Sequence, residues 1–447
     1  MTEIVWFRKD LRLADNPAWS AATNSGTEVV PLFVIDPRLW DRASALRVRL
    51  LAAHLRALDA EIVEAGGRLM VHTGAPEESI PTIVERLGAS LVRVNADHTP
   101  FAKRRDASIS ATVPTETHHG SYVHRPGSIL TSEGGRYRVF TPYHRRWAEE
   151  PVPPPDTPGD ASISSERVEE IPDPGPPPVT AGSVGAEERL AEFERHVDRY
   201  PDERDRPDLD TTSRLSIDLK WGTIGPRALI HRIGTHTPGR AAFVRQLAWR
   251  DFYADILDDR PDTVDAPLRP EYREIEWNDD PQGLDAWKRG TTGYPIIDAG
   301  MRQLVAEGWV HNRVRMLVAS FLVKDLLVDW RLGERFFRHH LIDGDVAQNV
   351  GNWQWAAGTG ADAAPYFRIF NPVSQSKKFD PEGRYIKRWI PELARLDAPA
   401  IHAPWEAGPL DLAAAGVTLD ETYPSPIVDH GAARERTLSR YKQALEK

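Results

Sequence analysis

The chain has 447 residues, 40% of them hydrophobic and 27% charged, so it is long enough for two or three hydrophobic cores. It contains no cysteine, which excludes disulfides, thiolate metal sites and cysteine nucleophiles. No apolar run approaches the roughly 20 residues of a membrane helix, and the N-terminal segment lacks the pattern of a signal peptide. We therefore expect a cytoplasmic protein with no membrane segment and no metal site.

Short apolar runs in the first hundred residues alternate with helical patterns. The apolar runs cover residues 4–7, 31–35, 68–71 and 91–94, and helical periodicity covers 45–65, 77–87 and 100–111. This alternation is typical of a parallel β-sheet with helices on both faces. No GxGxxG motif follows the first run, so a standard dinucleotide site is not indicated. We predict an α/β domain over residues 1–130, with a parallel, Rossmann-like sheet.

The following segment, residues 131–185, is predicted to be a linker. Residues 151–178 contain ten prolines, which is too many for a helix or a central strand. Residues 151–210 carry sixteen Asp or Glu against six Lys or Arg, a balance of −10 that equals the net charge of the whole chain. We therefore expect this linker to be extended, acidic and rich in proline.

The rest of the chain, residues 186–447, is predicted to be an all-α domain. Helical periodicity covers residues 186–198, 225–233, 240–258, 297–307, 311–330 and 332–341. Residues 300–390 hold thirteen Lys or Arg against nine Asp or Glu, a local balance of +4. A basic region of this kind is compatible with binding a phosphate backbone, or is simply a solvated charged face.

Two faces of the predicted helices combine aromatic, amide and guanidinium side chains. The two sets, each spaced i, i+3, i+4 and i+7, are Gln246, Trp249, Arg250 and Tyr253, and Trp309, Asn312, Arg313 and Met316. An arginine beside a tryptophan is suited to gripping a phosphate next to a stacked base. The alternative is that each arginine only ends an otherwise hydrophobic core face.

Two further segments favour a ligand. Residues 343–372 place three carboxylates, five amides and two tryptophans around a Gly/Ala run. Burying such a polar group without a partner costs about 1–3 kcal/mol, so this density indicates a pocket for a flat, polar molecule. Residues 210–216, DTTSRLS, supply hydroxyls and backbone amides suited to a phosphate, or an ordinary helix cap.

Several longer motifs together resemble the DNA photolyase and cryptochrome family. They are WFRKDLRLADNPA, TSRLS, QLAWRDFYADIL, GYPIIDAGMRQLVAEGWVHNRVRM and FLVKDLLVDWRLGERFF, with the segment 343–372, and they follow the family order over essentially the whole chain. The resemblance implies an N-terminal antenna domain, a linker, and a helical domain that binds FAD. It also implies class I cyclobutane pyrimidine dimer photolyase activity, in which excited reduced FAD gives an electron to a flipped-out dimer in DNA.

The resemblance assigns cofactor contacts residue by residue. They are Tyr200, Thr212, Ser213, Arg214, Leu215, Ser216, Arg315, Asp343, Gly344, Asp345 and Asn349. Asn349 matches the position that faces flavin N5 in this family. Photolyases of this group have Asn there, whereas plant cryptochromes have Asp and animal cryptochromes have Cys. The asparagine favours a stable, fully reduced flavin and therefore repair over signalling.

The resemblance also assigns lesion contacts and an electron-transfer chain. Trp249 and Trp355 match the aromatic walls for the flipped dimer. The other residues that match DNA or dimer contacts are Arg204, Gln246, Arg250, Asn312, Arg313 and Met316. Trp277, Trp330 and Trp353 match the three-tryptophan chain that carries electrons to an oxidised flavin.

Two alternative functions stay open. A (6-4) photolyase resembles this chain in having Gln at position 246, where dimer photolyases have Glu, but it has two histidines where this chain has Asn312 and Met316. The missing histidine pair favours the cyclobutane dimer. A cryptochrome-like blue-light photoreceptor would act through a protein partner instead of repairing DNA.

The antenna chromophore is predicted from two residues of the N-terminal domain. Arg47 and Asp97 are similar to residues that line the site for 8-hydroxy-5-deazaflavin, which is therefore the expected chromophore. The alternatives are methenyltetrahydrofolate and no chromophore; folate-binding relatives have Glu and Lys where this chain has Ala102 and Asp258. We expect a monomer whose partner is DNA that contains pyrimidine dimers.

Overall fold

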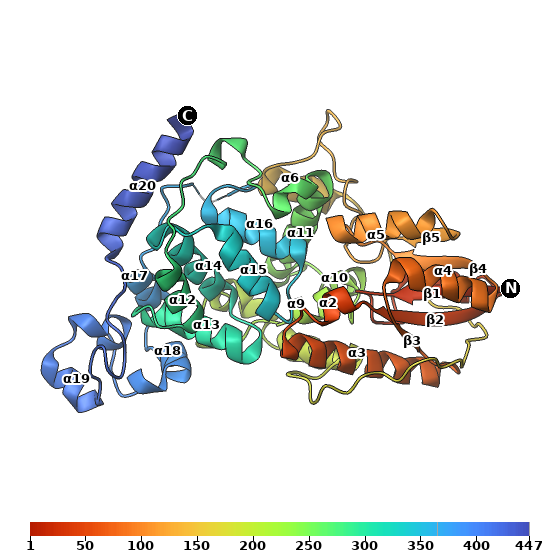
Figure 1. The fold of residues 1–447 in the computed structure, drawn as a ribbon, viewed down its shortest axis with the longest axis horizontal. Helices are drawn as coiled ribbons and strands as arrows, with labels where there is room; N and C mark the ends of the chain where they lie inside the picture. The colour runs from red at the N-terminus through yellow and green to blue at the C-terminus, as the bar shows by residue number, and fades with distance from the viewer. Residues whose placement is uncertain (364, 447) are drawn as a thin grey trace. The chain divides into compact units, whose positions relative to one another are not determined.

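The computed structural model of the chain describes residues 1–363 and 365–446 (Figure 1). Lys447, the last residue of the predicted helical domain, and residue 364, inside it, lie outside the described residues. The chain divides into two compact units, the first formed by residues 1–201 and 213–261 and the second by 202–212 and 262–447. The predicted domain boundaries at residues 130 and 185 stay predictions.

A five-stranded parallel sheet forms the centre of the first unit. Its strands are β1 (Thr2–Phe7), β2 (Glu28–Ile35), β3 (Met70–Thr73), β4 (Ala89–Asn95) and β5 (Thr115–His118), in the order β3-β2-β1-β4-β5. Strands buried on both faces read as continuous apolar runs, which is why the sequence predicts the first four. Strand β5 was not predicted because its four residues, TETH, are polar and partly exposed.

Helices cover both faces of this sheet, with α3 on one face and α5 on the other (Figure 1). The helices of the first unit are α1 (Pro17–Thr23), α2 (Pro37–Trp40), α3 (Ala45–Glu64), α4 (Pro76–Leu87), α5 (Pro100–Ser110), α6 (Phe140–Glu149), α7 (Gly182–Glu194), η1 (Val197–Arg199), α8 (Tyr200–Glu203, ending in the second unit), α9 (Ser216–Trp221), α10 (Pro226–Ile233) and α11 (Pro238–Asp259). Asn16, Thr99 and Thr237 cap α1, α5 and α11, and a proline follows each cap at the first helical position.

The proline-rich segment 151–181 contains no helix and runs along the first unit. Its contact with the sheet includes the hydrogen bond from the Val29 N–H to the Ser162 carbonyl at 2.8 Å, beside a bridge between Val29 and Ile163. Gly67 lies under this segment, and a Cβ there would come within 2.1 Å of the Ile163 side chain. The segment is therefore extended but packed.

The second unit is helical. Its elements are η2 (Pro261–Val264, beginning in the first unit), η3 (Pro270–Tyr272), α12 (Pro281–Arg289), α13 (Pro295–Glu307), α14 (Asn312–Ser320), η4 (Phe321–Asp325), α15 (Trp330–His340), α16 (Val346–Ala357), α17 (Pro372–Phe379), α18 (Arg384–Trp389), η5 (Pro391–Leu393), η6 (Ala400–His402), η7 (Pro404–Glu406), α19 (Pro409–Ala415) and α20 (His430–Glu446). One large apolar cluster includes residues of α12, α13, α14, η4, α15, α16 and α18. The predicted fold class, a parallel α/β domain with a helical domain, is confirmed.

The continuous helix predicted over residues 311–330 is wrong. Helix α14 ends at Ser320, a π-helical turn follows as η4, and Leu327 has a φ of +54° that ends the helical path. The Asn278 side chain binds the Leu326 carbonyl at 2.9 Å, and Asp329 then caps α15. The periodicity hid this break because nearly every side chain from 317 to 328 is buried. No helix of the described part of the chain is long and apolar enough to cross a membrane.

Candidate functional site

Helix α14 begins beside a buried histidine. His311 accepts a hydrogen bond through Nδ1 from the Arg313 backbone N–H at 3.2 Å, so it caps the helix. Burial lowers the pKa of His311 to about 4, which keeps the ring neutral and Nδ1 able to accept. This cap fixes the turn from which Asn312 and Arg313 project.

A cavity lined by α14, the end of α15 and α16 contains many of the predicted site residues. Its lining includes the predicted cofactor contacts Arg315, Asp343, Gly344, Asp345 and Asn349, the predicted lesion contacts Asn312, Met316 and Trp355, and Trp353 of the predicted electron-transfer chain. The second unit therefore places residues from all three predicted groups around one cavity. We call it the α14–α16 cavity.

Two carboxylates on this cavity have different surroundings. Asp343 is buried and pairs with Arg315 at 2.8 Å, and Arg315 also donates to the Val310 carbonyl at 2.7 Å. Asp345 caps α16 and accepts from the Gln348 N–H at 3.2 Å. A carboxylate has about four acceptor positions, so both can also accept hydrogen bonds from the N–H groups of a ring.

Asn349 is held by Glu334 of α15. Its side-chain NH₂ donates to the Glu334 carboxylate at 2.8 Å and to the Glu334 backbone carbonyl at 3.0 Å. Burial raises the pKa of Glu334, and Arg338 at 2.8 Å opposes that shift. Because both amide hydrogens have acceptors on α15, Asn349 offers its carbonyl oxygen, a hydrogen-bond acceptor, to a group in the cavity.

The hydroxyls of the DTTSRLS segment fit an anionic ligand. In the second unit, the buried Oγ1 atoms of Thr211 and Thr212 have no hydrogen-bond partner among the residues that the structure describes. Buried hydroxyls normally have partners, so these two indicate a missing acceptor such as a phosphate oxygen. Together with the acceptors of the α14–α16 cavity, they fit FAD, which joins a phosphate group to a ring that carries N–H groups.

The remaining predicted cofactor contacts lie in the first unit. Tyr200 packs edge-on against Phe193 and Phe243, and Ser216 begins α9. The Leu215 N–H donates to the Ser213 hydroxyl at 3.3 Å, and Arg214 has a φ of +51°. A positive φ in a non-glycine residue costs about 1–3 kcal/mol and is often found at ligand sites. The roles of these residues stay predictions.

The predicted tryptophan chain belongs to the core of the second unit. Trp330 and Trp353 are buried, and Trp277 packs against the same apolar cluster from its edge. Gly333 allows Trp353 to contact α15 closely, because a Cβ at position 333 would lie 2.2 Å from the Trp353 ring and 2.6 Å from Leu322. The absence of a side chain at Gly333 therefore determines where the Trp353 ring lies.

A fourth tryptophan was not predicted. Trp287 is fully buried, contacts Trp353 with ring centroids 6.1 Å apart, and donates from Nε1 to the Val318 carbonyl at 2.9 Å. Its position in an amphipathic helix is typical of an ordinary core residue. The sequence therefore contains no signal that separates it from a structural tryptophan.

The aromatic and amide residues of α11 already have partners within the first unit. The Trp249 ring stacks on Phe140 with centroids 3.7 Å apart and planes 10° apart. The Gln246 side chain donates to the Ala242 carbonyl, one turn earlier, at 3.0 Å. One face of the Trp249 ring is therefore covered by protein.

Arg250 is also held by the first unit. Its guanidinium donates to the backbone carbonyls of Ser121 and Leu219, the latter at 3.0 Å, and lies 4.3 Å from the centre of the Tyr122 ring. These contacts satisfy much of its donor capacity. A phosphate contact, as predicted for Arg250, would have to use its remaining N–H groups.

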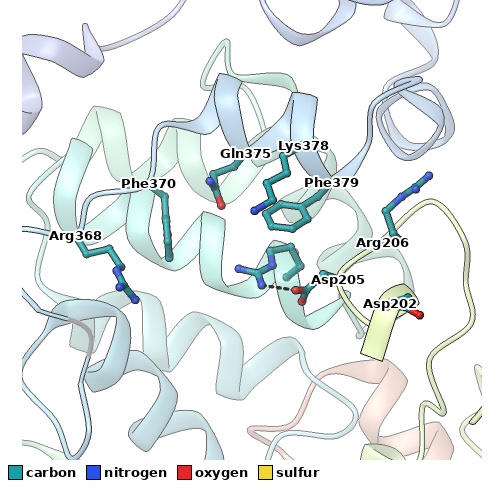
Figure 2. Close-up of a pocket in the computed structure, with 9 residues that line it drawn as sticks. Asp202, Asp205, Arg206, Arg368, Phe370, Gln375, Lys378 and Phe379 are labelled. Carbon is teal, nitrogen blue, oxygen red and sulfur yellow. Dashed lines mark ion pairs between the residues drawn. The ribbon is translucent and has the colours of Figure 1, made fainter. Parts of the chain in front are cut away.

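A second cavity, of about 460 Å³, lies beside Arg313 (Figure 2). Its lining residues are Asp202, Asp205, Arg206, Arg313, Arg368, Phe370, Gln375, Lys378 and Phe379. Four of the nine are cations and two are aromatic, which suits a phosphate beside a stacked base. We call it the basic cavity. The predicted contact Arg204 is half-buried in the same segment, 202–212, but is not part of the lining.

Arg313 is fixed from two sides in the basic cavity. It pairs with Asp205 at 2.8 Å, and its guanidinium lies 4.3 Å from the centre of the Phe379 ring. Gln375 and Lys378 come from α17, whereas Asp205 comes from the segment 202–212 (Figure 2). Lys378 and Arg368 were not predicted, although the basic excess of residues 300–390 contains both.

The two predicted antenna residues have partners in the first unit. Asp97 pairs with Lys9 at 2.9 Å, and this cation, with Arg8, keeps the pKa of Asp97 below its usual range despite burial. The Arg47 guanidinium lies 6.0 Å from the centre of the Trp221 ring. These contacts identify no chromophore.

Comparison with known proteins agrees with the geometry of the site. Residues 3–159 match the family described as DNA photolyase, and residues 243–443 match the FAD binding domain of DNA photolyase. A deoxyribodipyrimidine photo-lyase of Agrobacterium fabrum is 39% identical over 98% of this chain and 97% of its own.

Two solved structures resemble the whole chain. A bacterial class III photolyase from Agrobacterium tumefaciens has a TM-score of 0.94 and 38% identity, covering 100% of this chain and 98% of its own. A cryptochrome of Synechocystis sp. PCC6803 has a TM-score of 0.89 and 27% identity, covering 98% of each chain. With both family matches in place and full-length relatives well above 30% identity, the chain belongs to the DNA photolyase family.

Proposed function

We propose that this chain is a light-dependent lyase that repairs cyclobutane pyrimidine dimers in DNA. The observation that supports the proposal is the α14–α16 cavity, whose lining includes Asp343, Asp345 and Asn349 together with Trp355 and Asn312. Reduced FAD, when bound and excited by light, supplies the electron that opens the dimer. The chain's own residues bind and orient the cofactor and the dimer, and they exclude water from the cavity.

The cofactor side of the proposal rests on three acceptors and on the hydroxyls of Thr211 and Thr212. Arg315 neutralises Asp343, Asp345 caps α16, and Asn349 presents its carbonyl oxygen because Glu334 holds its NH₂. An acceptor at this position favours a protonated flavin N5, which is the fully reduced form.

The lesion side rests on Trp355, Asn312 and Met316. Trp355 provides an aromatic face worth about 1–3 kcal/mol per stacked base, enough to offset an unstacking cost of a few kcal/mol. Asn312 is exposed at the start of α14 and can bind the polar edge of a base. Neither Asn312 nor Met316 can act as an acid or base as a histidine pair would, which favours the cyclobutane dimer over the (6-4) photoproduct.

The basic cavity is proposed to hold the DNA backbone next to the lesion. Arg313, Arg368 and Lys378 place three cations around it. Neutralising phosphates gives affinity that falls steeply with salt. The chain has a net charge of −10, but residues 300–390, which contain Arg313, Arg368 and Lys378, have a local balance of +4.

Some finer features also belong to the proposal. Class I membership, a monomeric state, a cytoplasmic location and 8-hydroxy-5-deazaflavin as the antenna are supported by sequence reasoning alone. Trp353, Trp330 and Trp277 are proposed to carry electrons inward when the flavin is oxidised. A photoreceptor is the second candidate function, favoured by the cryptochrome structure that resembles the chain over 98% of its length.

The test measures repair of a thymine-dimer oligonucleotide and a (6-4) oligonucleotide by chemically reduced protein, in blue light and in darkness. We expect light-dependent loss of the cyclobutane dimer alone. Trp355→Ala should reduce repair strongly, whereas Trp405→Ala, which removes a half-buried indole packed against Tyr294, serves as the matched control. No repair of either lesion by flavin-loaded protein would overturn the proposal in favour of a photoreceptor.

A further inference from the structure

A carboxylate already occupies one of the cations of the basic cavity. Asp205, on the segment 202–212, binds the guanidinium of Arg313 at 2.8 Å, and Figure 2 draws this pair as a dashed line. The two side chains are 34% and 16% exposed, so water and salt screen the pair only in part. A phosphate that enters the cavity needs the same guanidinium, and the two anions therefore compete for it.

Arg206, another cation of the lining, has a different kind of partner. It donates to Asp208 through two hydrogen bonds, at 2.8 Å and 2.7 Å, and the Asp208 side chain is fully buried. This two-point geometry is the stronger form of the pair, and a ligand in the cavity does not reach a buried carboxylate. Asp205, in contrast, is itself part of the lining. It is therefore the carboxylate that an entering anion can displace.

The ring of Phe379 holds Arg313 in place independently of Asp205. The guanidinium lies 4.3 Å from the centre of this ring, and the ammonium group of Lys378 lies 5.1 Å from the same centre. Two like charges at one ring repel each other, and a nearby anion offsets that repulsion. Asp205 is this anion in the free protein, and a phosphate would be suited to the same place.

We propose that Asp205 competes with a DNA phosphate for Arg313 and so limits how tightly the chain holds DNA. This inference rests on the proposed function, which assigns the DNA backbone to the basic cavity. Asp205 occupies the guanidinium in the free protein, gives way when a phosphate enters, and returns when the DNA leaves. A repair enzyme has to release each repaired site, and a carboxylate that reclaims Arg313 favours that release.

The competition acts on the backbone and not on the lesion. Phosphates carry no information about damage, so Asp205 should lower the affinity for damaged and undamaged DNA alike. A role in positioning Arg313 would have the opposite sign, because loss of Asp205 would then weaken binding. The direction of the change in affinity therefore separates the two roles.

The first test measures binding of Asp205→Asn to dimer-containing and undamaged oligonucleotides by fluorescence anisotropy at several salt concentrations. Asparagine removes the charge but keeps the shape and an oxygen that accepts from Arg313. We expect both affinities to rise about fivefold at low salt, the worth of one partly exposed ion pair. The slope of affinity against salt should become steeper by about one, because Arg313 then neutralises a phosphate in full.

Two matched variants separate competition from a general change of charge. Asp285→Asn removes the same charge from another Asp–Arg pair of the second unit, with Arg289 at 2.8 Å on α12 and outside both cavities, and should change neither affinity nor slope. Asp202 lines the basic cavity, but the described residues show no ion pair between it and Arg313. Asp202→Asn should therefore tighten binding by less than about twofold.

The second test repeats Asp205→Asn in the Arg313→Ala background. The gain in affinity should disappear there, because no guanidinium is left to compete for. A full gain without Arg313 would show that Asp205 acts only through the overall field, and the inference would be wrong. An affinity of Asp205→Asn at or below that of wild type would also overturn it. Asp205→Ser, which removes the charge with a smaller side chain, takes its place if the asparagine variant does not fold.

The two proposals fail in different ways. Light-dependent repair of the thymine dimer by chemically reduced wild type tests the proposed function by itself. If wild type repairs the dimer and Arg313→Ala weakens binding, but Asp205→Asn does not tighten it, the inference about Asp205 is wrong and the proposed function stands. If Arg313→Ala changes neither affinity nor slope, the basic cavity does not hold the backbone, and the inference falls with that assignment.

Discussion

Helix α11 and residues 309–316, which end inside α14, carry the same sequence signature but use it differently. On α11, Trp249 is stacked on Phe140 and Arg250 is bound to backbone carbonyls of its own unit. On α14, Arg313 lines the basic cavity, and Asn312 lines the α14–α16 cavity. An arginine beside an aromatic residue therefore stabilises the fold in one place and lines a cavity in the other, and sequence spacing does not distinguish the two.

The largest expected effect separates these roles at Arg250. Arg250→Ala should lower the apparent free energy of unfolding by about 3 kcal/mol, because two backbone carbonyls lose their donor and the contact with Tyr122 is lost. Urea unfolding measures this change. Arg245→Ala, at an exposed position on the same helix, is the control and should cost less than about 1 kcal/mol.

If Arg250→Ala leaves stability at the level of the control but weakens binding of damaged DNA, the comparison fails. Arg250 would then act mainly as the phosphate contact that the family resemblance implies.

The next effect concerns pH and the start of α14. Because the pKa of His311 is lowered from 6.5 to about 4 in the folded chain, the unfolded chain binds a proton that the folded chain does not between these pH values. Stability therefore falls as pH falls through this window, by about 2 kcal/mol at pH 5 and on the order of 3 kcal/mol in total.

Unfolding free energies at pH 7 and pH 5 measure this contribution. His311→Gln keeps an acceptor for the Arg313 N–H but does not titrate, so its loss of stability on acidification should be smaller than that of wild type. An equal loss in both proteins would show that His311 does not set the acid response of α14.

A smaller effect is expected for Arg313 in binding. Arg313→Ala should weaken binding of dimer-containing DNA by about 2 kcal/mol and reduce the slope of affinity against salt by about one, because one phosphate contact is lost. Fluorescence anisotropy at several salt concentrations measures both quantities. Arg388→Ala, on α18 and outside both cavities, should change neither. A salt slope equal to that of wild type would contradict the phosphate role.

The smallest effect concerns Gln246 on α11. We expect Gln246→Glu to raise the quantum yield of dimer repair by less than about tenfold, because a carboxylate can share a proton with the dimer whereas Gln can only donate an N–H. The measurement is the yield per absorbed photon for chemically reduced protein. An unchanged or lower yield would contradict the hypothesis that glutamine at position 246 lowers the repair yield.

The sequence predicted the sheet and most helices because burial leaves a clear pattern in them. Strands buried on both faces give continuous apolar runs, and amphipathic helices give a 3.6-residue period. Strand β5 and the break at Leu327 were missed for opposite reasons. Strand β5 is too polar to be predicted as a strand. The residues around Leu327 are so completely buried that no polar face marks the end of α14.

Nine of the fifteen residues that line the α14–α16 cavity were predicted from the family resemblance, but their geometry was not. Nothing in the sequence shows that Glu334 holds the NH₂ of Asn349, since the two residues are fifteen positions apart on different helices. The basic cavity was missed for a related reason. Its walls come from segments far apart in the chain, around residues 205, 313 and 378, and only tertiary folding joins them.

Gly333 sets a limit on how this protein can be varied. With a Cβ at that position only 2.2 Å from the Trp353 ring, every substitution has to move an indole that lies between the α15 backbone and the α14–α16 cavity. A library that randomises the cavity walls therefore has to leave position 333 untouched. A substitution there would displace Trp353, which lines the cavity, without altering a single residue of the lining itself.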